Sequence, residues 1–180
     1  MNGTYPHRVW RLGADVDTDQ LAPGAYMKFS IEEIAKHCLE RVRPEFAGQV
    51  RPGDVLVAGP GFGIGSSREQ AAAALVTLGI SAVIAPSYSG LYFRNAFNVG
   101  LMLLTCPQAE TLAEGEHIAL DLEGGRVLRA DGGVLPCAAI PDFLRDMVQA
   151  GGLLPQLKRR LADGSLKANP MFSIRHDTRS

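Results

Sequence analysis

The chain has 180 residues, of which 46% are hydrophobic and 21% charged, and its formal net charge is −1. This length and balance suit a single globular domain with an apolar core. A net charge so close to zero excludes a general attraction to nucleic acid or to an anionic membrane, so we expect neither as a partner.

The N-terminal residues and the cysteines bear on where the protein works. Met1–Trp10 holds no apolar signal core, and no apolar run reaches membrane-spanning length, which predicts a cytoplasmic protein. Cys38, Cys106 and Cys137 are widely spaced, and no C-x-x-C pair occurs. We therefore expect free thiols and no metal site or iron–sulfur site built by this chain alone.

The first two thirds of the chain predict alternating strands and helices. The expected elements are a strand at Arg8–Leu12, a polar loop at Asp15–Gly24, a helix at Ile31–Arg41 capped by Ser30, a strand at Val55–Ala58, a helix at Ser67–Leu78, a strand at Ala82–Ala85, a helix at Leu91–Asn98 and a strand at Leu101–Leu104. This order implies a parallel sheet with helices packed on it.

The last third of the chain follows another pattern. His117–Leu122 and Arg126–Ala130 flank Gly124-Gly125, which predicts a β-hairpin. A final helix is expected from about Pro141, interrupted at Gly151-Gly152. We therefore predict an α/β domain over residues 1–165, with a mainly parallel sheet flanked by helices plus a hairpin. Residues 166–180 are expected to form a mobile or partner-bound tail.

A glycine-rich loop, Gly59–Gly65, joins one predicted strand to the predicted helix that follows it. Its four glycines let backbone N–H groups approach a ligand closely, and a helix N-terminus favours an anion. Ser66 and Ser67 add hydroxyl groups, and Arg68 adds a planar fork suited to a carboxylate. The pattern indicates an anion site with a hydroxyl that could be activated.

The residues of this loop exclude two nucleotide-binding motifs and leave a capped turn open. A Walker phosphate loop needs a lysine after Gly65, and a dinucleotide fingerprint needs a last glycine where Ser66 stands, so both fail. A tight turn with a serine N-cap stays open. Glu69 lies three residues after Ser66, which is the spacing of a capping box.

Several motifs, in order and spacing, resemble one known family. Gly63-x-Gly65-Ser66-Ser67-Arg68-Glu69 looks like the G-x-G-S-S-R-E motif of the aconitase-superfamily swivel domain, above all of the separate small subunits of 3-isopropylmalate dehydratases and their homoaconitase-like relatives. Asp15-Val16-Asp17-Thr18-Asp19 resembles the family's D-x-D-T-D, and Arg94-Asn95-Ala96-Phe97-Asn98-x-Gly100-Leu101 its R-N-x-x-N-x-G-L. The likeness runs from about Gly13 to Arg160.

The resemblance implies a swivelling β/β/α domain and a hydro-lyase reaction. Such enzymes move a hydroxyl between adjacent carbons of a 2-hydroxy-polycarboxylate, with a [4Fe-4S] cluster held by a large subunit in a heterodimer or heterotetramer. By resemblance, Ser66 is the base that takes the α-proton, and Asp19 also points into the active site. Ser67, Arg68 and the loop glycines Gly63 and Gly65 are expected to bind the carboxylate substrate.

The acidic segment Asp15–Asp19 has more than one interpretation. Asp15, Asp17 and Asp19 would share one side of an extended segment. A calcium loop is excluded there because the sixth and twelfth positions are Gln20 and Tyr26 rather than glycine and glutamate, and a solvated turn stays open.

The segment after Gly24 bears on the substrate. In the family, this region meets the variable substituent: isopropylmalate-type sequences are apolar here and homoaconitase-like ones carry a basic residue. Here Lys28 is basic and Phe29 apolar, and we take both as candidate substrate contacts. A solvated surface lysine remains an alternative for Lys28.

Three functional hypotheses follow. The first is the small subunit of a dehydratase, for 3-isopropylmalate in leucine biosynthesis or for a homoaconitase-like, dimethylmalate or methylcitrate substrate. The second is a stand-alone anion- or RNA-binding module, which the neutral charge disfavours. The third is a scaffold with a degenerate site, which the intact Ser66 and Arg68 disfavour.

Overall fold

The computed structural model describes residues 5–165, and the tail expected at 166–180 lies outside the described residues. The elements are β1 (His7–Arg11), α1 (Thr18–Leu21), the 3-10 turn η1 (Gly24–Tyr26), α2 (Ile31–Lys36), α3 (Phe46–Gln49), β2 (Val55–Val57), α4 (Gln70–Thr77), β3 (Ala82–Ala85), α5 (Gly90–Asn98), β4 (Met102–Thr105), the 3-10 turn η2 (Ala109–Thr111), β5 (His117–Asp121), β6 (Arg126–Arg129), β7 (Val134–Pro136), α6 (Asp142–Gln149) and α7 (Leu153–Ala162).

One mixed sheet organises the described residues, in the order β4-β3-β2-β1-β5-β6-β7. The four strands β4, β3, β2 and β1 are parallel, whereas β5, β6 and β7 continue the sheet antiparallel. The predicted parallel sheet with an added hairpin is confirmed. Every residue of β2 and β3 is buried, as expected for central strands covered on both faces.

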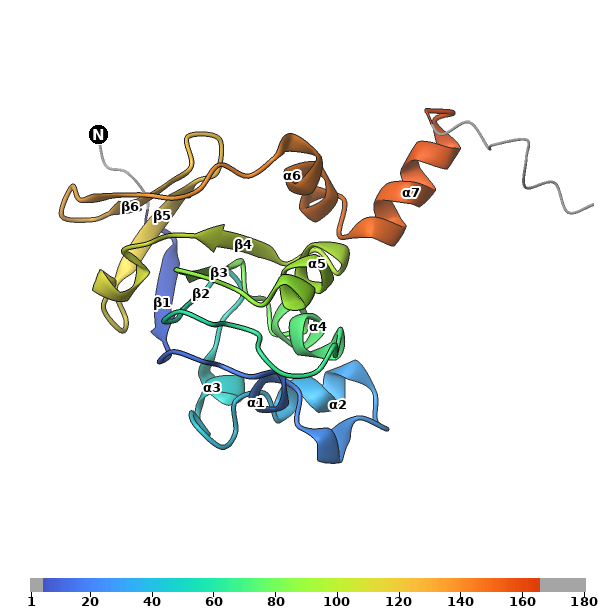
Figure 1. Cartoon of the computed structure of the whole chain (residues 1–180), viewed down its shortest axis with the longest axis horizontal. Helices are drawn as coiled ribbons and strands as arrows, with labels where there is room; N and C mark the ends of the chain where they lie inside the picture. The colour runs from blue at the N-terminus through green and yellow to red at the C-terminus, as the bar shows by residue number, and fades with distance from the viewer. Residues whose placement is uncertain (1–4, 166–180) are drawn as a thin grey trace, which may run out of the picture.

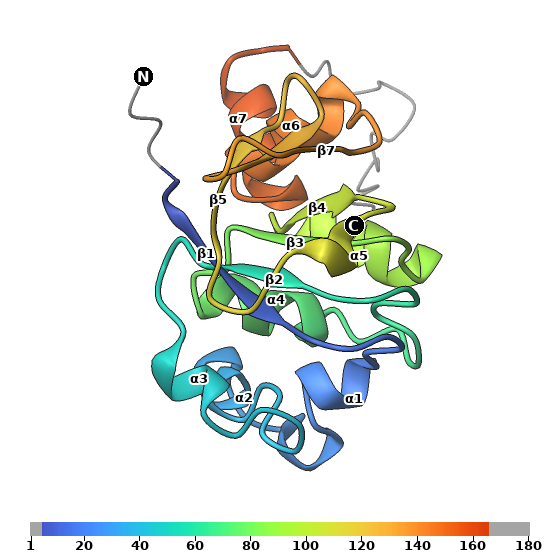
Figure 2. The ribbon, with the colours of Figure 1, turned by 90° about the vertical axis from the view of Figure 1, so that its left-hand side faces the viewer.

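The helices line up along the parallel half of the sheet. α4 packs against α2 and α5, α5 packs against α6, and α6 packs against α7. Figures 1 and 2 show α1–α3 at one end of the molecule and α6 and α7 at the other, with α4 and α5 between them. The row of helices therefore connects the N-terminal part of the chain to its C-terminal part.

Several predicted boundaries were wrong. The helix α2 ends at Lys36 rather than at Arg41 because Leu39 takes a positive φ of 62° and donates its N–H to the Gln20 carbonyl. The chain thereby turns back onto α1 and buries Cys38 and Leu39. The helix α4 begins at Gln70, three residues later than expected.

The short elements α1, α3 and β7 were not predicted, and neither were the 3-10 turns η1 and η2. The helices α1 and α3 have four residues each, and β7 has three. The break at Gly151-Gly152 is confirmed as the junction of α6 and α7. A Cβ on Gly152 would lie 2.4 Å from the Asn98 carbonyl oxygen, so this junction lies close against the end of α5.

Candidate active site

Three loops meet where the parallel strands β1, β2 and β3 end. Gly63 donates its N–H to the Val16 carbonyl at 2.7 Å, and Thr18 donates to the Ile64 carbonyl at 2.9 Å. On the other side, Phe62 and Ser87 are joined by a 3.1 Å backbone bond. The carboxyl ends of parallel strands are the usual place for a site in an open α/β sheet. The glycine loop thus lies between the D-x-D-T-D segment and the loop after β3.

Ser66 is exposed at the tip of this arrangement, and Thr18 holds it. The Ser66 N–H donates to Thr18 Oγ1 at 3.1 Å, and the two hydroxyl oxygens lie 3.3 Å apart. Thr18 is 2% exposed and lies in the first turn of α1. Its hydroxyl can donate to Ser66 Oγ while it accepts from the Ser66 N–H.

The capping box that the spacing of Ser66 and Glu69 would allow is not formed. Glu69 is the residue that precedes α4, and its side chain makes no capping bond. The Ser66 N–H is taken by Thr18, and the Ser67 carbonyl accepts a 3.2 Å bond from Asn95 Nδ2 on α5. These tertiary bonds keep residues 66–69 outside the helix and leave Ser66 and Ser67 on an exposed connecting segment.

Asp19, which follows Thr18, and Arg68, which lies two residues after Ser66, form an ion pair. Arg68 Nη1 donates to Asp19 Oδ1 at 2.7 Å and to the Ala22 carbonyl at 3.0 Å. The hydrogen bond from Arg68, with another from the Gly24 N–H at 2.9 Å, lowers the pKa of Asp19 below its usual value. Asp19 is therefore ionised at neutral pH. Arg68 Nη2 and Nε make no hydrogen bond within residues 5–165 and remain free to bind an anion.

The acidic segment is not extended. Asp17 is the N-cap of α1, where its side chain accepts the Gln20 N–H at 2.8 Å, and Gln20 completes a capping box. Asp19 lies in the helix that follows, whereas Asp15 takes a positive φ of 54°. The three carboxylates therefore have separate surroundings, and the structure places only Asp19 against Arg68.

Gly63 and Gly65 differ in exposure, since Gly63 is buried within the loop and Gly65 is exposed. Gly63 is buried with φ +79°, and a Cβ there would lie 2.2 Å from the Tyr92 ring, while its N–H is used by Val16. It shapes the loop. Gly65 is exposed with φ +105°, and a Cβ there would lie 3.0 Å from Thr18 Oγ1. A side chain at either position would disturb the loop that carries Ser66.

Lys28 and Phe29 are exposed on the segment that follows η1. The Lys28 Nζ lies 5.4 Å above the Phe29 ring, so the two side chains are neighbours. Ser30 caps α2, as predicted, by accepting the Glu33 N–H at 3.4 Å. The next residue, Ile31, lines a shallow hollow of about 250 Å³ together with Glu69 and Gln70. The hollow connects this segment to the end of the Ser66–Glu69 run.

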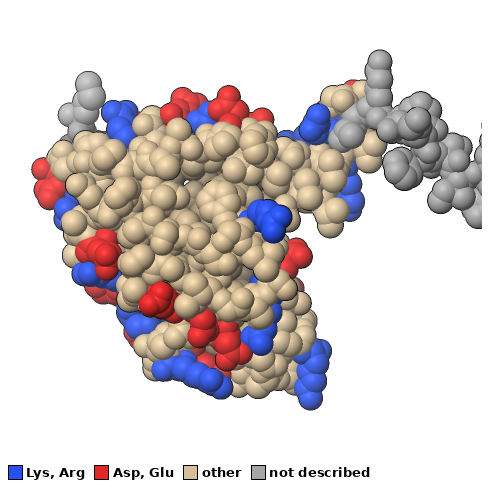
Figure 3. Space-filling view, in the orientation of Figure 1, with Lys and Arg blue, Asp and Glu red and all other residues tan. Residues whose placement is uncertain are grey.

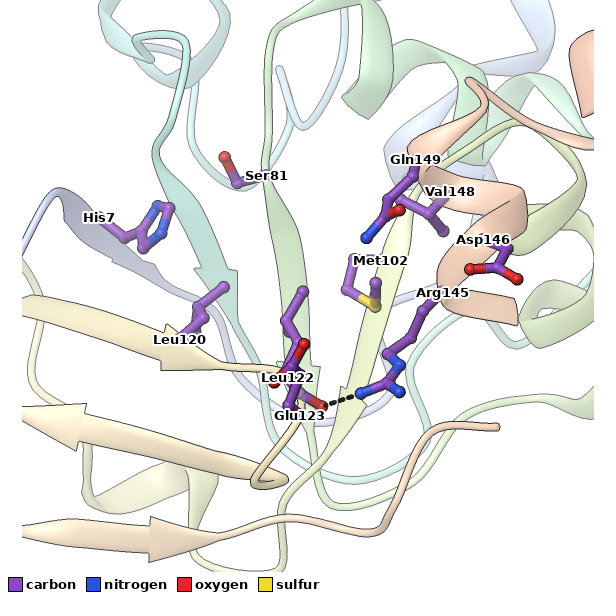
Figure 4. A pocket seen from close by; sticks show the side chains of 10 residues that line it. All are labelled: His7, Ser81, Met102, Leu120, Leu122, Glu123, Arg145, Asp146, Val148 and Gln149. Carbon is purple, nitrogen blue, oxygen red and sulfur yellow. Dashed lines mark hydrogen bonds between the residues drawn. The ribbon is translucent and has the colours of Figure 1, made fainter. Parts of the chain in front are cut away.

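A larger cavity lies at the amino ends of the parallel strands. It holds about 500 Å³ and is lined by His7, Ser81 and Met102 from the beginnings of β1, β3 and β4, and by Arg145 from α6 (Figure 4). Arg145 Nη1 donates to the Leu122 carbonyl at 3.2 Å. Because Ser66 follows the carboxyl ends of the strands and this cavity adjoins their amino ends, the cavity is no part of the candidate active site.

The metal-binding potential of this chain is low at every described position. Within residues 5–165, no three His, Cys, Asp or Glu side chains come together to hold a metal ion. Cys38 is fully buried, and burial raises the pKa of its thiol well above the usual value. The side chains of residues 5–165 therefore do not fit a [4Fe-4S] cluster. No helix in the same range is long and apolar enough to cross a membrane.

Comparisons with known proteins identify the family. The family model of the aconitase C-terminal domain matches residues 26–109. The 3-isopropylmalate dehydratase small subunit 1 of Archaeoglobus fulgidus is 44% identical over 149 residues, which cover 82% of this chain and 92% of that protein. The isopropylmalate/citramalate isomerase small subunit of Methanocaldococcus jannaschii is 41% identical over 166 residues, 91% of this chain and 99% of its own length.

This chain belongs to the 3-isopropylmalate dehydratase small-subunit family. The crystal structure of a 3-isopropylmalate dehydratase from M. jannaschii confirms the fold, with a TM-score of 0.83, 37% identity, and coverage of 88% of this chain and 96% of that one. The predicted aconitase-type swivel fold is therefore confirmed. The matched regions cover 92% and 99% of the length of the two curated relatives.

Proposed function

We propose that this chain is the small subunit of a cytoplasmic hydro-lyase that interconverts 2- and 3-isopropylmalate in leucine biosynthesis. The observation that carries the proposal is the exposed Ser66 hydroxyl, held by the buried Thr18, whose sequence neighbour Asp19 pairs with Arg68. A large subunit would bring the [4Fe-4S] cluster, which supplies Lewis-acid activation of the leaving hydroxyl when bound. The domain that takes part would cover residues 1–165.

Ser66 would act as the base that removes the proton from the substrate carbon next to a carboxylate. A serine at its ordinary pKa is a poor base, so its alkoxide needs stabilisation. Thr18 can supply one hydrogen bond to Ser66 Oγ, across the 3.3 Å that separates the two oxygens. If the large subunit excludes water from Ser66, that hydrogen bond becomes stronger. The abstracted proton would then reside on Ser66 Oγ until the reverse addition.

Arg68 would bind a substrate carboxylate through its free Nη2 and Nε. The hydrogen bonds from Nη1 to Asp19 and to the Ala22 carbonyl hold the planar guanidinium in place. They therefore fix the direction in which Nη2 and Nε point. Asp19 is ionised and already accepts two hydrogen bonds, which suits it to hold Arg68. Ser67 and the exposed Gly65 would add hydrogen bonds to the same carboxylate, and Gly63 shapes the loop that presents them.

The segment with Lys28 and Phe29 would choose the substituent of the substrate. Its exposed apolar ring suits the isopropyl group, whereas the ammonium group of Lys28 suits a further carboxylate, as in homocitrate-type acids. The M. jannaschii relative is named for isopropylmalate and citramalate, both of which carry an apolar substituent. This favours a substrate with an apolar group, with related dehydratase substrates as the alternative.

Reconstitution tests the proposal. The purified chain, mixed with the large subunit of the same organism under anaerobic conditions, should form a complex that dehydrates 3-isopropylmalate, measured by the absorbance of the unsaturated acid. Dimethylmalate, methylcitrate and homocitrate-type acids form the comparison panel. A stable complex that is inactive on isopropylmalate and active on a homocitrate-type acid would contradict the assigned substrate. Absence of any complex would contradict the assigned role.

A further inference from the structure

The helix α7 exposes an apolar face that nothing within the described chain covers. Leu154 is 69% exposed and Leu161 58% exposed. They are seven residues apart, which puts them on the same face of the helix, two turns and about 10 Å from each other. Figure 1 shows α7 projecting from the body of the molecule. Isolated exposed leucines are ordinary, but two on one face of a projecting helix form a surface suited to contact.

This face is continuous with the candidate active site. A hollow of about 370 Å³ is lined by Glu69, which directly follows Arg68, by Leu154 of α7 and by Asn98 of α5. Asn98 also lines an apolar groove of about 360 Å³ between α5 and α6, together with Phe97 and Phe143. Phe143 is itself 61% exposed. We call Phe143, Leu154 and Leu161 the C-terminal apolar surface.

The size of this surface suits a large partner. A stable protein interface covers about 800 Å² on each partner, which is more than one face of a ten-residue helix can supply. The two hollows extend the C-terminal apolar surface onto α5 and toward Glu69. Figure 3 shows an uncharged area in the middle of the molecule that extends toward α7. One partner could therefore cover α7 and reach the Ser66 loop in the same contact.

The charges of α7 indicate the chemistry of that partner. Lys158, Arg159 and Arg160 follow one another on the helix, and Leu153–Ala162 contains no acidic residue. A second copy of the chain, packed helix against helix, would bring these cations together. These charges disfavour a second copy of the chain and suit a different protein that carries acidic side chains around an apolar centre.

We propose that the C-terminal apolar surface is a docking site for the large subunit, which binds α7 and the α5–α6 groove while it covers Ser66. This inference rests on the proposed function, because only that function requires a second subunit at Ser66. The basic residues of α7 would form the rim of the contact, and the exposed leucines and Phe143 its apolar centre.

The test measures binding of the purified large subunit to the full chain by calorimetry. The variant Leu154→Glu/Leu161→Glu should bind about tenfold more weakly or worse, and Leu154→Ala/Leu161→Ala should show a smaller loss. Val134→Glu is the matched control, since Val134 is 50% exposed on β7, the strand farthest from β4 in the sheet. It should bind like the wild type. The isolated variants should unfold at the wild-type temperature, because both leucines are exposed.

The outcomes separate this inference from the proposed function. Wild-type affinity in the Leu154→Glu/Leu161→Glu variant, with reconstituted activity, would overturn the docking surface alone. So would a dimer of the chain, seen by analytical ultracentrifugation, that this variant loses while its affinity for the large subunit is unchanged. A wild-type chain that never binds the large subunit would overturn the proposed function as well.

Discussion

The buried hydroxyl of Thr18 should control the reactivity of Ser66, and the variant Thr18→Val tests this. Valine keeps the shape of the side chain but removes the acceptor for the Ser66 N–H and the hydroxyl that lies 3.3 Å from Ser66 Oγ. Each neutral hydrogen bond stabilises a folded protein by about 0.5–1.5 kcal/mol. Because Ser66 is exposed and its N–H can turn to water, we expect a loss near 1–2 kcal/mol, which lowers Tm by about 2–8 °C.

The effect on catalysis should exceed the effect on stability. Without Thr18, Ser66 loses the contact that fixes its position, and a displacement of about 1 Å can cost about 10²-fold in rate. We expect kcat of the reconstituted enzyme to fall about 10- to 100-fold with KM nearly unchanged, because Thr18 does not touch the substrate. Thr18→Ser keeps the hydroxyl and should restore most of kcat. Wild-type kcat in Thr18→Val would refute the positioning role, and so would equal losses in Thr18→Ser and Thr18→Val.

Two further predictions concern stability, measured by chemical denaturation. Gly63→Ala should destabilise the chain by more than about 2 kcal/mol, since its Cβ would lie 2.2 Å from a neighbouring ring, while Gly48→Ala, with open space around the Cβ, should be neutral or stabilising. An equal effect at both positions would contradict the packing of the loop. Burial alone would raise the pKa of Asp54, but hydrogen bonds from Arg8, from the Arg51 N–H and from Trp10 lower it below its usual value. The stabilisation is therefore present above that usual value and is lost as the pH falls through the lowered pKa, so Asp54→Asn should cost about 2–4 kcal/mol at pH 7 and less at acid pH. A difference in the free energy of unfolding between Asp54→Asn and the wild type that does not change with pH would contradict the lowered pKa of Asp54.

The strands and the main helices were predictable because each has a strong local signal. The apolar runs at Val55–Ala58 and Ala82–Ala85 are central strands, and Gly124-Gly125 is the turn of the hairpin. The short helix α1 was not predictable from periodicity, since four residues make one turn. The strand β7 was hidden by Pro136 and the preceding glycines, and its place at the sheet edge is where proline is tolerated.

The motifs indicate which residues form the candidate site, but they do not predict the contacts of these residues. Ser66 and Thr18 are 48 positions apart, and no local pattern predicts that the hydroxyl of one binds the backbone of the other. The expected helix start at Ser67 failed for the same reason, because the bond between Asn95 and the Ser67 carbonyl spans 28 positions. Tertiary contacts of this kind override local helix preference.

The most direct test of the site compares Ser66→Ala with Ser81→Ala in the reconstituted enzyme. Ser81 immediately precedes β3 and lines the cavity at the amino ends of the parallel strands. It serves as the matched control because Ser66 follows the carboxyl ends. Loss of a general base costs about 10²–10⁴-fold in rate. We predict that Ser66→Ala lowers kcat on 3-isopropylmalate by about that factor while the affinity for the large subunit is unchanged, and that Ser81→Ala has wild-type kcat. A Ser66→Ala enzyme with wild-type kcat would contradict the assignment of Ser66 as the base.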